Sequence, residues 1–98
     1  MKITETRNEG TLTLALEGRL DTTTAPELEQ ATKDKLEGVT ELILDLAGLE
    51  YISSAGLRIL LSLQKAMNRL GSMKVIHVNE IVSEVFDVTG FSDILNIE

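Results

Sequence analysis

Leucines alternate with polar or small residues near the start of the chain, at Leu12, Leu14 and Leu16. A period of two residues is typical of a strand that buries one of its faces. The Asn-Glu-Gly sequence of residues 8–10 precedes this alternation and favours a tight turn. We therefore expect residues 2–17 to form an N-terminal β-hairpin.

Two largely apolar runs farther along the chain indicate buried strands. Residues 42–46, Leu-Ile-Leu-Asp-Leu, are too few for a free-standing helix, and such a run is typical of a strand covered on both faces. Residues 73–78 form the second run. The sequence predicts two parallel strands, with residues 42–46 at the centre of the sheet. His77, the only histidine, falls inside the second run and is expected to be a packed strand residue.

A first helix is predicted after the hairpin. Thr24 and Glu27 have the spacing of a capping box, and Pro26 suits a first helical turn because its missing N–H costs nothing there. The helix should therefore begin at Ala25. Gly38 marks its expected end.

The longest helical pattern follows the central apolar run. Polar residues recur at helical spacing at Arg58, Ser62, Lys65 and Arg69, while apolar residues fill most of the remaining positions. This pattern predicts a largely buried helix with one exposed stripe. Gly71 stands where a left-handed residue would end it.

A third helix is expected to begin at Asn79 or Glu80 and to end at Gly90. Four of its residues are expected to face inward: Ile81, Val82, Val85 and Phe86. The apolar tail after Gly90 is expected to form an edge strand or a helical turn. Together these elements predict a single α/β domain over residues 1–98, with a mixed sheet, βαβ crossovers and about three to four helices.

Charge and residue usage narrow the classes of function. The formal net charge of −7 argues against direct nucleic-acid binding, because phosphate contacts need clustered Lys and Arg, and it favours a partner with a basic surface. The absence of cysteine excludes disulfides and cysteine-based metal sites. No apolar run approaches the length of a membrane span, and the first residues lack the apolar core of a secretory signal. We expect a cytoplasmic protein without membrane insertion, metal or cofactor.

Enzymatic activity is not expected from these residues. The chain has no G-x-S-x-G turn and no glycine-rich phosphate-binding motif. The 16 carboxylates show no metal-ligand spacing with the single histidine. The sequence thus favours a binding module over a catalyst.

The turn before the long helix carries the candidate chemistry. Ser53 and Ser54 precede the helix, and Ala55 and Gly56 are small enough to leave the Ser54 hydroxyl uncovered. A serine at this place can cap the first free backbone N–H groups. A phosphoryl group there would also be favoured by those N–H groups and by the helix dipole. Both interpretations, an N-cap and a modification site, fit the pattern.

The segment LILDLAGLEYISSAGLRILL resembles the signature of the bacterial anti-sigma-factor antagonists, the STAS domain family. In that family an apolar strand and a short loop lead to Asp-Ser-(Ser/Thr/Ala)-Gly-Leu-Gly at the start of a helix. The serine that the family phosphorylates matches Ser54, and Ser53 is the weaker candidate. Two residues depart from the signature, because Ser53 replaces the Asp and Arg58 replaces the second Gly.

A second segment, LEGRLDTTTAPELE, is similar to the family's other signature, Gly-x-(Leu/Ile)-Asp followed by Thr or Ser. Asp21 matches the signature's Asp. The family places this loop beside the phosphorylated serine. The resemblance thus implies a partner-binding surface with seven members: Asp21, Thr22, Thr23, Ser53, Ser54, Gly56 and Arg58.

The resemblance implies an anti-sigma-factor antagonist. Such a protein binds an anti-sigma factor, itself a serine kinase, and so releases the sigma factor. Phosphorylation of Ser54 by the kinase would switch the antagonist off, and a serine phosphatase would restore it. The alternative is a STAS-type interaction subunit of another bacterial assembly, such as a stress-signalling complex or a lipid transporter, without a phosphorylation switch.

Overall fold

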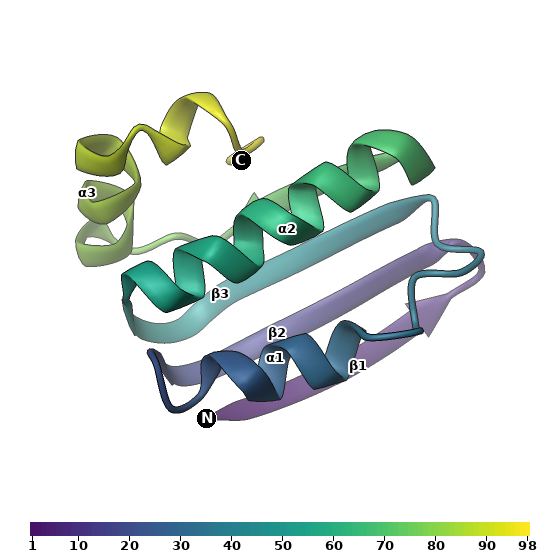
Figure 1. The fold of residues 1–98 in the computed structure, drawn as a ribbon, viewed down its shortest axis with the longest axis horizontal. Coiled ribbons are helices and arrows are strands. Elements are labelled where there is room, and N and C mark those ends of the chain that lie inside the picture. Colours follow the sequence, from purple (N-terminus) through teal and green to yellow (C-terminus); the bar gives the residue numbers. More distant parts are fainter.

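The chain forms an α/β fold in which one four-stranded sheet supports three α-helices (Figure 1). The computed structural model describes all residues from 1 to 98. The elements in chain order are β1 (Lys2–Asn8), β2 (Thr11–Leu20), α1 (Ala25–Thr32), β3 (Glu41–Ile52), α2 (Ser54–Leu70), β4 (Ser72–Ile76), α3 (Glu80–Thr89) and the 3-10 turn η1 (Phe91–Asp93).

The strands lie in the order β1-β2-β3-β4. β1 and β2 pair antiparallel as a hairpin, with Asn8 opposite Thr11 at the turn. β2 pairs parallel with β3, and β3 pairs parallel with β4. The predicted hairpin and the predicted mixed sheet with a parallel part are therefore confirmed, and β3 lies between two parallel neighbours.

The hydrophobic core lies on one face of the sheet, which α1 and α2 cover (Figure 1). On β3, Leu42 and Leu44 are fully buried, whereas Ile43 and Asp45 point to the other face and are only half-buried. The expectation that this strand is covered on both faces is wrong. Burial alternates along this strand with a period of two, although most of its residues are apolar, and Ile43 lies on the more exposed face.

α1 begins at Ala25 as predicted, but its ends are built differently from the prediction. Thr24 makes no side-chain cap. Its hydroxyl instead donates to the carbonyl oxygen of Arg19 at 2.7 Å and accepts from the backbone N–H of Asp21 at 2.8 Å. The helix ends at Thr32, well before Gly38, and Asp34 then takes a left-handed conformation with φ 62°. The capping box is therefore absent, and its threonine holds the preceding loop.

α2 matches the predicted bounds, and its polar stripe is exposed as expected. Gly71 ends the helix but is not left-handed, since its φ of 165° is that of extended backbone. A Cβ atom at this position would clash with the carbonyl oxygen of Thr40. Close approach of the two chain segments is thus the reason for a glycine here.

α3 also has the predicted start and stop. The Asn79 side chain accepts from the N–H of Val82 at 2.8 Å, and Gly90 is left-handed with φ 83°. The expectation that Ile81 faces inward is wrong, because 61% of this residue is exposed. The tail contains the expected helical turn, η1, and after it only an isolated parallel bridge between Ile97 and Val75, not an edge strand. None of the helices combines the length and the apolar character needed to cross a membrane.

Candidate functional site

The two candidate loops are neighbours because β2 and β3 end at the same edge of the sheet. Leu20 is opposite Ile52 in the parallel register. The backbone N–H of Ser53 then donates to the carbonyl oxygen of Leu20 at 2.9 Å. The hydrogen bond between Ser53 and Leu20 therefore joins the start of the Asp21 loop to the start of the Ser53 turn. Loops beyond the carboxyl ends of parallel strands are the usual place for contacts with ligands and partners.

The two serines of the turn have different roles. Ser53 is the N-cap of α2, and its hydroxyl accepts from the N–H of Gly56 at 3.5 Å, a long hydrogen bond. Ser54 is the first residue of the helix and is exposed. Its hydroxyl makes no hydrogen bond within the protein. Ser53 is thus the cap, and Ser54 carries the free hydroxyl. The sequence had left these two roles as alternatives for the turn.

Gly56 allows the start of α2 to pack directly on the ends of the strands. A Cβ atom at this position would lie 2.7 Å from Cγ of Leu20 and 2.9 Å from Cγ1 of Ile52. Both distances are shorter than real Cβ contacts, so the helix would have to move away from the sheet. The glycine therefore sets the position of the Ser54 turn.

Asp21 organises the loop that follows β2. One carboxylate oxygen accepts from the Thr23 hydroxyl at 2.7 Å, from the Thr23 N–H at 3.0 Å and from the Thr24 N–H at 3.2 Å. The hydrogen bond from the Thr23 hydroxyl and the further bonds from Thr23 and Thr24 lower the pKa of Asp21, although partial desolvation opposes them. The carboxylate is therefore held by its own loop, and Thr23 is held with it.

The other two predicted surface residues meet in a shallow hollow beside the turn. Thr22 and Arg58 line it together with Pro26 and Ala55, and its volume is about 450 Å³. Both Thr22 and Arg58 are exposed. The fold thus brings Thr22, Arg58 and the residue after Ser54 to one surface, while the hydrogen bonds of Asp21 hold the loop that carries Thr22.

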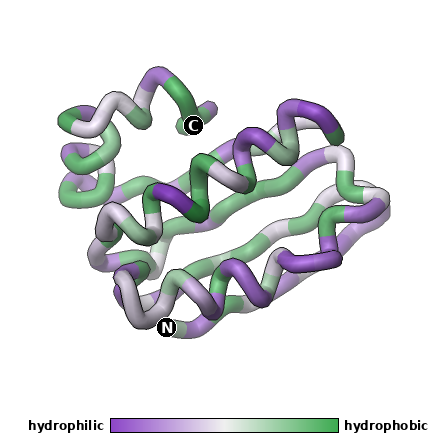
Figure 2. Tube along the Cα trace, viewed as in Figure 1, coloured by the Kyte–Doolittle hydropathy of each residue, from purple (hydrophilic) through white to green (hydrophobic).

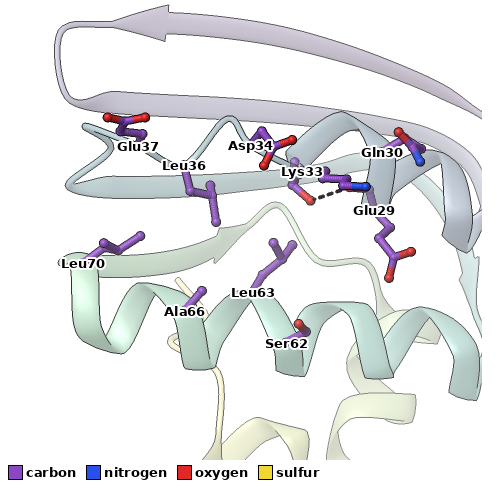
Figure 3. A pocket seen from close by; sticks show the side chains of 11 residues that line it. Glu29, Gln30, Lys33, Asp34, Leu36, Glu37, Ser62, Leu63, Ala66 and Leu70 are labelled. Atoms are coloured by element: carbon purple, nitrogen blue, oxygen red, sulfur yellow. Dashed lines mark hydrogen bonds between the residues drawn. The ribbon is translucent and has the colours of Figure 1, made fainter.

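A groove between α1 and α2 was not predicted from the sequence. It has a volume of about 780 Å³, and Leu36 and Leu63 point toward each other across it (Figure 3). It shares Glu29 and Ser62 with the hollow next to the turn. The segment that follows the early end of α1 lines this groove, and the stop signal at Gly38 had placed that end six residues later.

A hydrogen-bonded contact between His77 and Asp45 was also missed. The Nδ1 atom of His77 lies 2.8 Å from a carboxylate oxygen of Asp45, and 62% of the His77 side chain is exposed. His77 follows β4 in a left-handed conformation, with φ 60°. The expectation of a packed strand histidine is therefore wrong. No signal in the sequence marks this pair, because His77 comes near Asp45 only through the parallel register, in which Asp45 is opposite Ile76.

The pKa of Asp45 reflects this contact. Partial burial raises it, but the hydrogen bond from the Ala47 N–H and the interaction with His77 outweigh that effect, so the pKa lies below its usual value. No three His, Asp or Glu side chains in the protein are grouped so that they could hold a metal ion.

Comparison with known proteins identifies the family of this arrangement. The family model for the STAS domain matches residues 2–98. BtrV of Bordetella bronchiseptica, named as a candidate anti-sigma factor antagonist, is 33% identical over 99 residues, which cover 99% of this chain and 85% of BtrV.

Two solved structures share the fold. An anti-sigma factor antagonist from Mycobacterium paratuberculosis superposes with a TM-score of 0.87 at 23% identity, over 98% of this chain and 83% of that chain. The Bacillus cell fate determinant SpoIIAA in its phosphorylated form superposes with a TM-score of 0.73 at 17% identity, over 99% of this chain and 91% of that chain. The predicted α/β architecture is thus that of these proteins, and the chain belongs to the STAS domain family.

Proposed function

We propose that this protein is an anti-sigma-factor antagonist switched by phosphorylation of Ser54. With Ser54 unmodified, it binds a cytoplasmic anti-sigma factor and so releases the sigma factor. The observation that carries the proposal is the free, exposed hydroxyl of Ser54 beside the Asp21 loop. The antagonist role is supported by the relative BtrV and the mycobacterial structure, which are named as anti-sigma factor antagonists.

The position of Ser54 suits a switch that leaves the fold unchanged. A phosphoryl group adds about −1.5 to −2 units of charge and three acceptor oxygens. At the first residue of α2 these oxygens face backbone N–H groups that lack helical partners, at the positive end of the helix dipole. The modified side chain has room because Ser54 is exposed. SpoIIAA, which has the same fold, is known in a phosphorylated form.

The change would therefore act on the partner surface. In the unmodified protein, Thr22 and Arg58 contact the anti-sigma factor around Ser54, while Asp21, Thr23, Ser53 and Gly56 hold the two loops in place. The phosphoryl group adds volume and charge at the centre of that contact. The complex then weakens through steric overlap and altered electrostatics, without unfolding of either protein. The protein itself needs no catalytic group for this role.

The kinase in this scheme is the anti-sigma factor. It transfers the γ-phosphoryl group of ATP to the Ser54 oxygen, with loss of the hydroxyl proton and release of ADP. A separate serine phosphatase returns Ser54 to its hydroxyl form. These two activities reside in the partners.

The intact mass of the protein after incubation with ATP and the serine kinase encoded nearest to it tests the proposal. We expect a gain of one phosphoryl group in the parent and in Ser53→Ala, and no gain in Ser54→Ala. A gain that persists in Ser54→Ala but is lost in Ser53→Ala would transfer the role to Ser53. No gain in any variant would reject the switch.

One observation favours a second candidate, a STAS-type subunit that works by binding alone. The residue before the acceptor is Ser53, which serves as a cap, in the place where the antagonist signature has an aspartate. A subunit of a stress-signalling complex or of a lipid transporter would not need a kinase to recognise this turn. Genes for transporter subunits beside this one, together with an unchanged mass in the experiment above, would support that role.

A further inference from the structure

The surface of α3 carries an apolar stripe that the rest of the protein leaves largely uncovered. Ile81 is 61% exposed and Val88 is 77% exposed. Val85 lies between them at helical spacing and is half-buried. Three of the four large hydrophobic side chains that are exposed in this protein belong to its last 18 residues: Ile81, Val88 and Ile94. Figure 2 shows apolar residues interspersed with polar ones along this helix. Isolated exposed hydrophobic residues are common, but a row along one helix face is typical of an interaction surface.

An acidic row runs beside this stripe. Glu80, Glu84 and Asp87 follow one another at helical spacing, and all three are exposed. They also line one side of a shallow hollow of about 410 Å³. No Lys or Arg occurs after Lys74 in the sequence. The negative charge of α3 therefore has no basic neighbour on its own segment.

These charges select the kind of partner. A second copy of the protein would bring the same acidic row to the interface and would be repelled, because like charges facing each other cost energy. The formal net charge of −7 adds to this repulsion. A helix with an apolar stripe flanked by Lys or Arg would instead cover Ile81 and Val88 and pair with the acidic row.

The place of α3 in the fold connects this surface to the Ser54 turn. The Asn79 side chain, which caps α3, donates to the carbonyl oxygen of Leu49 at 2.7 Å and so fixes the helix to β3. Leu49 lies three residues before Ile52, where β3 ends and the turn of Ser53 and Ser54 begins, and Figure 1 draws α3 toward the same end of the sheet as the start of α2. One partner could therefore contact both the turn and α3.

We propose that α3 is a second docking surface for the anti-sigma factor and that it binds a basic amphipathic helix of that partner. This inference rests on the proposed function, from which it takes the identity of the partner. In this arrangement the turn around Ser54 controls release, and α3 supplies affinity that does not depend on the phosphorylation state.

Titration calorimetry with the purified kinase in the presence of ADP, which prevents phosphoryl transfer, tests the inference. The double variant Ile81→Ser/Val88→Ser removes the apolar stripe, and Glu84→Lys reverses one charge of the acidic row. The matched controls are Leu70→Ser, a 46% exposed leucine at the far end of α2, and Glu37→Lys, an exposed glutamate in the loop before β3.

We expect the Kd to rise at least about tenfold for the double variant and about threefold or more for Glu84→Lys, with the controls close to the parent. The Kd of the parent should also rise more steeply with salt than that of Glu84→Lys, because an ion pair is lost in the variant. Glu84→Lys keeps the test valid if the double variant fails to fold.

The opposite outcomes separate the inference from the proposed function. If the kinase phosphorylates Ser54 but binds the parent and both α3 variants equally, the docking surface is wrong and the switch stands. If it neither binds nor phosphorylates the parent, both proposals fail. If sedimentation shows a dimer of the parent that Ile81→Ser/Val88→Ser dissociates, α3 binds a second copy and the inference is overturned.

Discussion

The backbone N–H of Ser53 donates to the carbonyl oxygen of Leu20 at 2.9 Å. This hydrogen bond continues the parallel pairing of β2 and β3 by one residue beyond Leu20 and Ile52. It ties together two loops that are separated by more than 30 residues of sequence. The exposed hydroxyl of Ser54 therefore has a fixed position relative to the Asp21 loop, as the proposed switch requires.

Gly56→Ala should destabilise the protein and displace the Ser54 turn. The added methyl group would overlap the side chains of Leu20 and Ile52, and overpacking of this kind costs about 1–3 kcal/mol. Urea unfolding measures the loss. Ser62→Ala, an exposed position of the same helix, serves as the control and should change the free energy of unfolding by less than about 0.5 kcal/mol. An unchanged free energy for Gly56→Ala would mean that α2 is not held against the strands as described.

Arg58→Ala should sharpen the phosphorylation switch. Arg58 is exposed one helical turn after Ser54, where a cation attracts a phosphoryl group on that serine and offsets part of its charge. The ratio of the Kd for the kinase with phosphorylated protein to that with unmodified protein should therefore increase, by about twofold to tenfold.

Lys65→Ala is the control for this prediction, since it removes an equal charge farther along the exposed stripe of α2. Its ratio should stay at the parent value. Equal ratios for Arg58→Ala and the parent would show that Arg58 does not interact with the phosphoryl group.

Asp45 should make the stability of the protein depend on acid pH. Its pKa in the folded state lies below the usual value of 3.8, because the contacts with Ala47 and His77 outweigh the effect of burial. The unfolded chain therefore takes up the proton first, so the stabilisation is present above pH 3.8 and is lost as the pH falls through the folded pKa.

Free energies of unfolding measured between about pH 2 and pH 6 test this dependence. Asp45→Asn should show a smaller loss on acidification than the parent. A loss will remain in the variant, because the lowered pKa of Asp21 acts in the same direction. Identical profiles for the parent and Asp45→Asn would contradict the lowered pKa of Asp45 that the contacts with Ala47 and His77 produce.

Local sequence patterns predicted most of the fold because they reflect local physics. The alternation around Leu14 predicted the hairpin. Asn79 and Gly90 predicted the two ends of α3. The end of α1 was missed, since Gly38 suggested a stop while Asp34 reverses the backbone first. A left-handed aspartate leaves no strong signal in a single sequence.

The candidate site could be located from the sequence but not built in detail. The turn at Ser54 was visible because small residues follow it. The separation of roles between Ser53 and Ser54 was not, because either serine can cap a helix and only the backbone conformation decides. His77 was misjudged for a related reason. Its partner Asp45 is distant in sequence and is brought near only by the register of β3 and β4.

The most direct test of the switch compares the affinity of the anti-sigma factor kinase for two forms of this protein, unmodified and phosphorylated at Ser54, each purified and verified by intact mass. The Kd should be at least about tenfold weaker for the phosphorylated form, while circular dichroism spectra of the two forms should coincide because the fold is unchanged. Equal affinities for the two folded forms would contradict the account.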